Sequence, residues 1–271
     1  MTTVVDAERA KRISIITISF NQQRFLDECI RSVLEQNVDA LEYIIVDPGS
    51  TDGSREIIAR YANRFDAAIL EPDDGPADGL NKGFRRATGD IFGYVNSDDR
   101  LAPGALKYVI DYFDSHGDID VLCSAIRITD ESGRAELRKR TPDLFDLRAY
   151  AAGVCTVGQQ ATFIRRRAFE AVGGFNPLNR ICWDGELLVD MALAGARFAT
   201  TSHVLGDFRI YPESMTGSGM FKSEKYRREH ARIADKIRAR GIALDGKLAL
   251  MLRRLAYKAN VARHLRYVLA R

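Results

Sequence analysis

The run IFGYVNSDD, residues 91–99, indicates how the rest of the chain is organised. Its first five residues favour a buried strand, and the polar residues that follow favour a turn. Two adjacent carboxylates at such a place raise each other's pKa unless a cation lies nearby, and Mg²⁺ is commonly bound by one or two carboxylates plus phosphates. Asp98 and Asp99 are therefore candidates for an open metal site. The alternative is a turn that caps a helix beginning near Pro103.

The residues around this run alternate between strand-like and helix-like segments. Such alternation predicts an α/β fold with a mostly parallel sheet covered on both faces, in which ligands bind beyond the carboxyl ends of the strands. The predicted strands are residues 13–20, 43–46, 67–70 and 91–95, and the predicted helices are residues 25–34, 55–64, 77–87 and one from Pro103.

Polar side chains recur where the predicted strands end. Ser19 and Asn21 close the first strand, Asp47 the second, Glu71 the third and Asp98 the fourth. Each residue taken alone is also a common turn residue. Their recurrence at one edge of the sheet favours a shared crevice.

The second half of the chain is harder to interpret. We predict strands at residues 121–128, 135–140 and 162–164, a helix at 185–194, and a helical pattern from Phe221 that is broken near Gly241 and Gly246. We divide the chain into a tail at residues 1–12, a catalytic domain at 13–217 and a basic helical extension at 218–271.

The composition is that of an ordinary globular protein, with 46% hydrophobic and 28% charged residues. We expect no signal peptide and no membrane span, because no apolar run is long enough. The four scattered cysteines are expected to be reduced thiols of a cytoplasmic protein, and the four histidines have no ligand spacing.

The net charge of +3 hides an asymmetry. From Lys222 onward there are 15 Lys and Arg against 4 Asp and Glu, which leaves 25 basic and 33 acidic residues before it. This basic tail has an apolar face formed by Leu244, Leu248, Met251, Leu252 and Leu255, with Lys247, Arg253, Arg254 and Lys258 around it. Such a helix could lie on the anionic inner face of the cytoplasmic membrane. The alternatives are packing against the catalytic core or against a second copy in a homodimer.

Five motifs occur in the order found in family 2 glycosyltransferases with the GT-A fold, and the chain resembles that family over residues 13–215. The resemblance implies a GT-A-type, Rossmann-like sandwich in which residues 13–99 hold a nucleotide-sugar and residues 100–217 hold the acceptor. The motifs are IITISFN at 15–21, VDPGSTDG at 46–53, EPDDG at 71–75 with Asp78 and NKG at 81–83, ATGD at 87–90, and NSDD at 96–99.

The resemblance also implies residue roles in donor binding. Thr17, Ser19, Asn21 and Asp47 correspond to the part that holds the base and ribose. Asp78, Asn81 and Lys82 lie at a helix facing the crevice, where Lys82 could meet a phosphate; the alternative is a solvated helix lysine. Asp52 also matches a family position but is equally suited to capping a helix.

Asp98 and Asp99 match the family's D-x-D-type motif, which holds Mg²⁺ or Mn²⁺. The first acid of that motif is Asn96 here. We therefore assign the metal to Asp99, with Asp98 as the second candidate, and assign nucleotide contacts to Asn96 and Asp98.

The family's general base follows a Gly-Gly-Phe segment, which is present here as residues 173–175. Asp184 matches the base position, Glu186 is the runner-up, and capping of the helix is the alternative role for Asp184. Tyr211 stands where the family usually has His. Arg209 is expected either to reach the diphosphate or to form a surface salt bridge.

These residues together predict a single displacement with inversion, from a nucleotide-sugar, UDP in first place, to a glycan or lipid-linked acceptor in cell-envelope polysaccharide synthesis. One alternative is a non-catalytic sugar-nucleotide-binding module. A nucleotidyltransferase is a weaker alternative because SFNQQR at 19–24 lacks the glycines of a phosphate loop. We expect no nucleic-acid partner.

Overall fold

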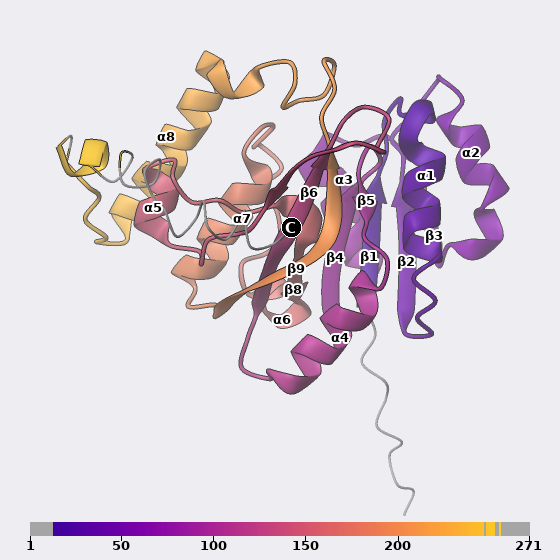
Figure 1. Cartoon of the computed structure of the whole chain (residues 1–271), viewed down its shortest axis with the longest axis horizontal. Coiled ribbons are helices and arrows are strands. Elements are labelled where there is room, and N and C mark those ends of the chain that lie inside the picture. The colour runs from indigo at the N-terminus through magenta and orange to yellow at the C-terminus, as the bar shows by residue number, and fades with distance from the viewer. Residues whose placement is uncertain (1–12, 247, 253–254, 256–271) are drawn as a thin grey trace, which may run out of the picture.

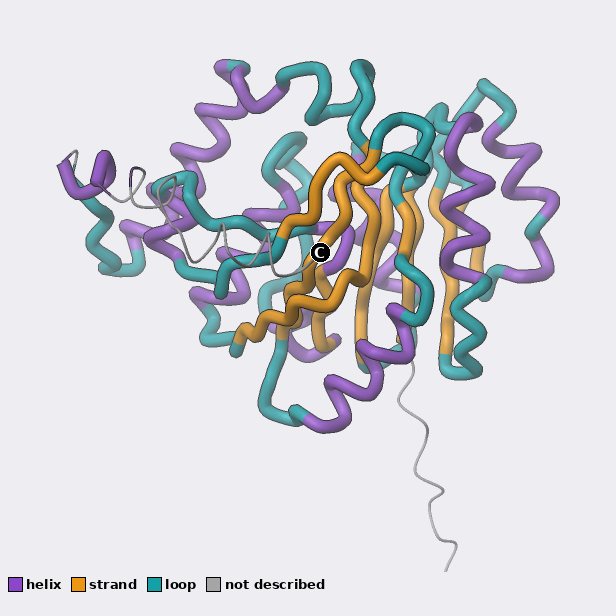
Figure 2. The backbone as a smooth tube through the Cα atoms, in the orientation of Figure 1, coloured by secondary structure: helices purple, strands orange, loops and turns teal. Residues whose placement is uncertain are grey.

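A nine-stranded sheet runs through the molecule, in the order β3-β2-β1-β4-β8-β6-β9-β5, with β7 beside β6. The computed structural model describes residues 13–246, 248–252 and 255, and Figures 1 and 2 show the arrangement. The strands are β1 (Ile13–Ile18), β2 (Leu41–Val46), β3 (Ala67–Ile69), β4 (Ile91–Asn96), β5 (Arg100–Leu101), β6 (Val121–Thr129), β7 (Glu136–Arg140), β8 (Thr162–Arg165) and β9 (Phe198–Arg209).

The first half of the sheet is parallel, as expected. Strand β1 pairs in parallel with β2 and β4, so that Ile18 lies opposite both Val46 and Asn96. The carboxyl ends of these strands therefore meet at one edge, the upper edge in Figure 2. The second half is mixed, because β8 runs antiparallel to both β4 and β6 while β9 runs parallel to β6.

Helices cover both faces of the sheet because successive strand residues point to opposite sides. Ile16 packs in the core beneath α3, α6, α7 and α8, whereas its neighbour Ile15 packs in the core beneath α1, α2 and α4. The helices are α1 (Gln23–Leu34), α2 (Ser54–Arg60), α3 (Pro76–Arg86), α4 (Ala105–Ser115), α5 (Leu147–Ala151), α6 (Arg166–Ala171), α7 (Trp183–Leu193) and α8 (Glu224–Ala239), with 3₁₀ turns η1 (Ala62–Arg64), η2 (Gln159–Ala161) and η3 (Met220–Lys222).

Two helix boundaries differ from the sequence-based prediction. Helix α4 begins at Ala105 rather than near Pro103, because Gly104 precedes it in the left-handed conformation with φ 75°. Helix α2 ends at Arg60, and a separate 3₁₀ turn follows where the prediction continued the helix to residue 64.

The basic extension begins as part of the body. Ile233, Ala234 and Ile237 of α8 are buried, and α8 packs against α5 and α7. Helix α8 therefore packs against the core, whereas the three roles predicted for the apolar face from Leu244 to Leu255 stay predictions. Leu248, Met251, Leu252 and Leu255 are all more than half exposed, while Lys247, Arg253, Arg254 and Lys258 lie outside the described residues, as does the tail at 1–12. None of the helices in the described part of the chain is long and apolar enough to cross a membrane.

Candidate active site

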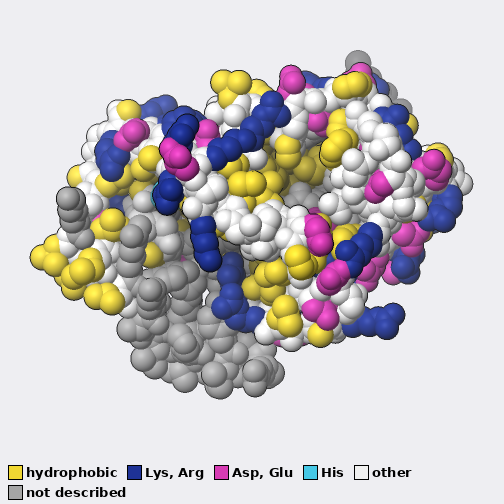
Figure 3. All heavy atoms as spheres, turned by 90° about the horizontal axis from the view of Figure 1, so that it is seen from above, with side chains coloured by type: hydrophobic (Ala, Val, Ile, Leu, Met, Phe, Trp, Pro, Cys, Tyr) yellow, Lys and Arg dark blue, Asp and Glu magenta, His cyan; other side chains and the backbone are white. Residues whose placement is uncertain are grey.

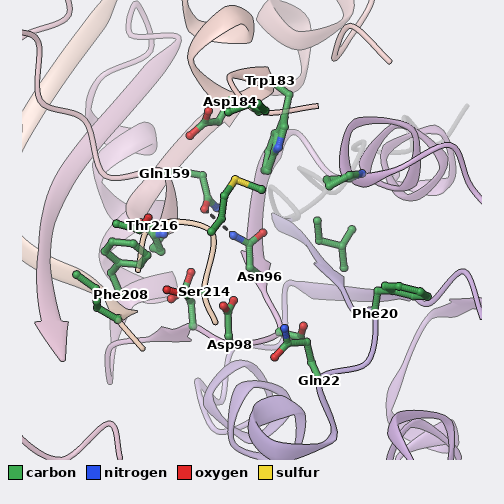
Figure 4. Close-up of a pocket in the computed structure, with 18 of the residues that line it drawn as sticks. Phe20, Gln22, Asn96, Asp98, Gln159, Trp183, Asp184, Phe208, Ser214 and Thr216 are labelled. Carbon is green, nitrogen blue, oxygen red and sulfur yellow. Dashed lines mark hydrogen bonds between the residues drawn. The ribbon is translucent and has the colours of Figure 1, made fainter. Parts of the chain in front are cut away.

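A cavity of about 740 Å³ opens at the carboxyl edge of the parallel strands, the edge seen from above in Figure 3. Its volume falls within the roughly 300–1,000 Å³ typical of small-molecule sites. It is lined by the ends of β1 and β4, by the start of α7, and by β9 with the loop after it. The lining residues in Figure 4 include Phe20, Gln22, Asn96, Asp98, Gln159, Trp183, Asp184, Phe208, Ser214 and Thr216.

Asp98 and Asp99 both line this cavity, where the chain turns at the end of β4. The Asp98 carboxylate accepts a hydrogen bond from the Tyr211 hydroxyl at 3.0 Å. Asp99 is 2% exposed, and its Oδ1 accepts from the Arg209 backbone N–H at 2.9 Å. Its Oδ2 has no hydrogen-bond partner among the described residues. A buried carboxylate oxygen without a partner calls for a ligand or an ion.

The pKa shifts of Asp98 and Asp99 are those expected of a carboxylate pair that binds a cation. Burial raises the pKa of Asp98, and burial together with the charge of Asp98 raises the pKa of Asp99 well above its usual range. A divalent cation at Asp99 Oδ2 would reverse this effect by favouring both charged forms. No group of three or more His, Cys, Asp or Glu able to hold a metal occurs among the described residues. The chain therefore offers two carboxylates, and Mg²⁺ commonly completes such a shell with phosphate oxygens and water.

Two further polar atoms in the cavity lack partners within the described part of the chain. They are Ser19 Oγ and Asn96 Oδ1, at the ends of β1 and β4. The other end of the Asn96 amide donates to Gln159 Oε1 at 3.1 Å, the bond dashed in Figure 4. Ser19 and Asn96 are thus placed where a polar ligand would satisfy them; the strand-end pattern predicted this place for Ser19, and the family resemblance for Asn96.

Asp184 lies at the opposite end of the cavity in Figure 4, beside Trp183, with Asn96 and Gln159 between it and Asp98. It is in the first turn of α7, where its Oδ1 accepts from the Gly185 N–H at 2.8 Å. Burial raises the pKa of Asp184. A carboxylate in a cavity with a raised pKa has the properties of a general base.

Glu186, the runner-up for the base, is wrongly predicted. Its buried carboxylate turns away from the cavity and is held by Arg232 at 2.6 Å and Lys236 at 2.8 Å, both in α8. Burial alone would raise the pKa of Glu186, but these hydrogen bonds lower it to about 2. The helical spacing of two residues places Asp184 and Glu186 on different sides of α7.

Arg209 is not in the cavity, contrary to the prediction that it reaches a diphosphate. Its guanidinium is 3% exposed and lies over the Phe25 ring, 4.5 Å from the centroid. It donates to Glu28 at 2.5 Å and to the Asp98 carbonyl at 2.9 Å. Arg209 therefore positions the Asp98–Asp99 turn from behind, and its salt bridge is partly buried, since Glu28 is 36% exposed.

Several predicted donor residues are also outside the cavity lining, because they bond within the protein. Thr17 is buried against the Tyr43 hydroxyl, 3.0 Å away. The Asp47 carboxylate accepts from the N–H and hydroxyl of Ser50, at 2.8 and 2.6 Å. Asn21 accepts from the Thr51 N–H at 2.9 Å. Their hydrogen bonds shape the loops that bring Phe20 and Pro48 to the cavity, and donor binding by these three residues stays a prediction.

The predicted α3 residues act in the same way. Lys82 donates to the Pro72 carbonyl and lies 3.6 Å from Asp78, so that it holds the loop before α3 rather than facing the cavity. Asn81 exchanges hydrogen bonds of 2.8 and 2.9 Å with the backbone of Phe175. The Lys82 side chain is 18% exposed, so it is only partly solvated, and its predicted contact with a phosphate stays a prediction.

The residues that sequence reasoning missed come mainly from two places. Trp183 precedes the candidate base, and Phe208, Met215, Thr216 and Phe221 belong to β9 and the loop after it. Phe20 was placed inside the predicted strand 13–20, whereas β1 ends at Ile18 and leaves the Phe20 ring 59% exposed. The sequence gives no local signal for the loop residues, since they reach the cavity only because β9 runs back through the sheet to this edge.

A sequence profile described as "Glycosyl transferase family 2" matches residues 14–173, more than half of the chain. The chain belongs to glycosyltransferase family 2. Among curated relatives of this family-2 chain, an uncharacterized glycosyltransferase of Nostoc sp. is 27% identical over 210 residues, covering 74% of this chain and 65% of its own length. Another uncharacterized glycosyltransferase, from Mycobacterium tuberculosis, is 30% identical over 190 residues, which cover 68% of this chain and 70% of its own length.

Solved structures confirm the fold of this glycosyltransferase. The mannosyltransferase PcManGT from Pyrobaculum calidifontis has a TM-score of 0.65 at 18% identity and covers 97% of this chain and 74% of its own. S. aureus TarS 1–349 has a TM-score of 0.62 at 19% identity, covering 84% and 72%. The chain spans 43% of the longer TarS chain, so the two share a fold over that part alone.

Proposed function

We propose that this glycosyltransferase moves a sugar from a nucleotide-sugar, with UDP-sugars as first candidates, to a hydroxyl of a glycan or lipid-linked acceptor, with inversion. One observation carries the proposal. A carboxylate pair suited to a cation and a carboxylate suited to a base line the same cavity from opposite ends. An acceptor hydroxyl beside Asp184 would then face a donor held near Asp98.

Similar proteins support the choice of donor. TarS 1–349 was solved in complex with UDP-GlcNAc, and PcManGT in complex with GDP-Man and Mn²⁺. These two structural neighbours use different nucleotides, so the donor requires a direct test. A Bacillus subtilis relative named as a putative teichuronic acid biosynthesis glycosyltransferase, 34% identical over 103 residues, supports a role in cell-envelope polysaccharide synthesis.

We propose that Asp99 holds Mg²⁺ or Mn²⁺ through Oδ2, with Asp98 beside it. When bound, the cation supplies positive charge against the diphosphate leaving group. The chain's own residues prepare the site for it. The Arg209 backbone orients Asp99, and Tyr211, which replaces the family's usual His, donates to Asp98 and so orients its carboxylate.

Asp184 is proposed to accept the proton of the acceptor hydroxyl as the new glycosidic bond forms. Its raised pKa strengthens it as a base, and its place at the start of α7 favours the carboxylate form. A direct attack from the side opposite the leaving group inverts the anomeric centre. The aromatic wall of Trp183 and Phe221 would help to exclude water from this end of the cavity.

The test is a donor screen. UDP-, GDP- and dTDP-sugars are added to the full chain with Mn²⁺, and the melting temperature is recorded before transfer is measured by release of the nucleotide. We expect one nucleotide class to stabilise the protein by a few degrees at saturating concentration and to be consumed. Stabilisation without consumption, with a panel of acceptors or with water, would instead identify a non-catalytic binding module.

A further inference from the structure

A second cavity, of about 190 Å³, lies beside the main one. We call it the side cavity. It is bounded by β4, by the start of α7, by the segment from 145 to 157 and by the beginning of α8. The two cavities share five lining residues, namely Val157, Gln159, Ile181, Asp184 and Phe221. The side cavity therefore adjoins the main one at the candidate base.

The walls of the side cavity are mostly apolar. Aromatic rings of Tyr94, Phe145, Tyr150 and Tyr226 line it together with aliphatic side chains of β8 and α7, and Asp184 is the sole charged residue among its described lining. The Phe145 and Tyr150 rings pack with centroids 5.7 Å apart, which gives this wall a fixed shape.

Gly185 allows this wall to come close to the base. A Cβ at that position would lie 2.2 Å from the Tyr150 hydroxyl oxygen. Any other residue there would push Tyr150 away from the first turn of α7. The absence of a side chain thus lets an aromatic ring stand directly beside Asp184, which precedes Gly185 in the chain.

The size of the side cavity limits its occupant. It is smaller than the roughly 300 Å³ at which whole-ligand sites begin, so it suits one substituent of a larger molecule. An apolar protein cavity of about 150 Å³ holds a benzene molecule. Apolar surface of a substituent that packs against these rings and aliphatic side chains is removed from water, which is favourable.

We propose that the side cavity is an acceptor subsite for an apolar substituent about the size of a phenyl ring, carried next to the hydroxyl that Asp184 deprotonates. The inference rests on the proposed function, because it takes Asp184 as the base. It adds a substrate class: acceptors with an aryl or short alkyl group close to the reacting hydroxyl are preferred over fully polar ones.

The first experiment compares methyl and benzyl glycosides of the acceptor sugar with the full chain, Mn²⁺ and the donor found in the screen. We expect kcat/KM to be about tenfold higher for the benzyl glycoside, since burying apolar area of this size is worth at least that factor. In Cys155→Phe, which fills the side cavity, the preference should fall to within about twofold. Leu178→Phe is the control, because Leu178 is 83% exposed and outside both cavities, and it should keep the preference.

The second experiment does not depend on transfer. Binding of 4-fluorobenzyl alcohol is followed by ¹⁹F line broadening with the wild type, Cys155→Phe and Leu178→Phe. We expect broadening with the wild type and Leu178→Phe and its loss with Cys155→Phe. If Cys155→Phe has no cooperative melting transition, the smaller Cys155→Leu replaces it in both experiments.

The outcomes separate the two proposals. Transfer with equal kcat/KM for the two glycosides would overturn the subsite while the glycosyltransferase mechanism stands. Probe binding that depends on position 155, with no transfer to any acceptor, would support the side cavity as an apolar site and count against the proposed mechanism. Broadening that is equal in all three proteins would show that the probe binds elsewhere and overturn the subsite.

Discussion

Two carboxyl groups in the first turn of α7 have opposite electrostatic surroundings. Asp184 faces the cavity, and burial raises its pKa. Glu186 faces α8, and its hydrogen bonds from Arg232 and Lys236 lower its pKa to about 2. When the surroundings of two neighbouring acids shift their pKa values in opposite directions, the two acids are suited to different roles. Here one is suited to proton transfer and the other to holding a helix in place.

Asp184→Asn should leave donor binding nearly intact and lower kcat by roughly 10²–10⁴-fold, the usual contribution of a general base. Donor binding is measured by calorimetry with Mn²⁺, and transfer by nucleotide release. The matched control is Asp111→Asn, an exposed carboxylate on α4 outside the cavity, which should change neither. Transfer near the wild-type rate in Asp184→Asn would remove Asp184 from the mechanism.

The pH profile gives an independent test of the same residue. The base acts when deprotonated, and the pKa of Asp184 is raised. The kcat/KM of the wild type should therefore rise with pH along an acid limb whose midpoint lies above the usual Asp value of about 3.9. The residual activity of Asp184→Asn should lack this limb, and an unchanged limb would assign it to another group.

Asp99→Asn should abolish Mn²⁺-dependent donor binding and stabilise the metal-free protein. Because the folded state raises the pKa of Asp99, folding favours the protonated form, and the penalty is present at neutral pH. A neutral amide removes that penalty, so the melting temperature without metal should rise by about 2–4 °C. Differential scanning calorimetry with and without Mn²⁺ and donor measures both effects. A donor-induced shift as large as that of the wild type would contradict the assignment.

Sequence reasoning located residues at the site when the backbone alone decides their position. Ser19 and Asp98 follow parallel strands and Asn96 ends one, and the carboxyl ends of these strands share an edge. Asp47 also follows a parallel strand but lies outside the cavity lining, where its carboxylate bonds to Ser50. Sequence reasoning failed for Lys82 and Arg209, because a long cation has several anionic or carbonyl partners within reach, and the choice depends on loops distant in sequence. The nearest acceptors turned out to be Pro72 for one and Glu28 for the other.

At the scale of elements, the strands with apolar β-branched residues were predicted to within a few residues. Strand β9 was missed because its residues, FATTSHVLGDFR, are interrupted by a glycine and by hydrophilic residues that lie exposed at its first half. Its pairing with β6 contains register shifts near Ser124 and Ala125, which no local pattern reveals. The failure to predict β9 matters because this strand brings Phe208 and the following loop to the cavity.

Helix α8 is fastened to α7 through Glu186, which gives an element-scale prediction. Glu186→Gln should lower the free energy of unfolding by about 2 kcal/mol at pH 6. This is less than the 3–5 kcal/mol for a fully buried pair, because Arg232 and Lys236 are 41% and 35% exposed. Urea unfolding measures the change.

The pH dependence of this effect has a definite sign. Since the folded pKa of Glu186 is lowered to about 2, its contribution is full above its usual value of about 4.3 and is lost as the pH falls toward 2. The difference between wild type and Glu186→Gln should therefore be smaller at pH 3 than at pH 6. A difference that is constant over this range would mean that the ion pairs do not carry the stabilisation.

At the scale of the whole molecule, the charge is divided between an acidic body and a basic C-terminal part. Part of that basic charge is neutralised within the protein, because basic residues of α8 form ion pairs with Glu186 and Asp190 of the body. The segment from 247 to 271 carries seven Lys and Arg and no Asp or Glu. The exposed Leu252 and Leu255 lie in the described part of this segment, which makes it the candidate for contact with an anionic membrane.

Removing residues 247–271 tests this contact. The full chain should float with vesicles that contain phosphatidylglycerol at low salt, and the truncated chain should remain in solution, since each basic residue near such a surface contributes about 1 kcal/mol. Flotation of the full chain should weaken with added salt and be absent with phosphatidylcholine alone. Equal flotation of the two chains would exclude this segment from the contact.

The ion pairs between Glu186 and α8 join the last described long helix to the turn that carries the candidate base. Asp184 is thus held by residues that leave the ribosome about fifty positions after it. A nascent chain can complete the parallel strands β1 to β4 early, yet the end of the cavity at Asp184 lacks these ion pairs until Lys236 has emerged. We expect a chain cut short before α8 to bind the proposed nucleotide-sugar but to transfer its sugar poorly.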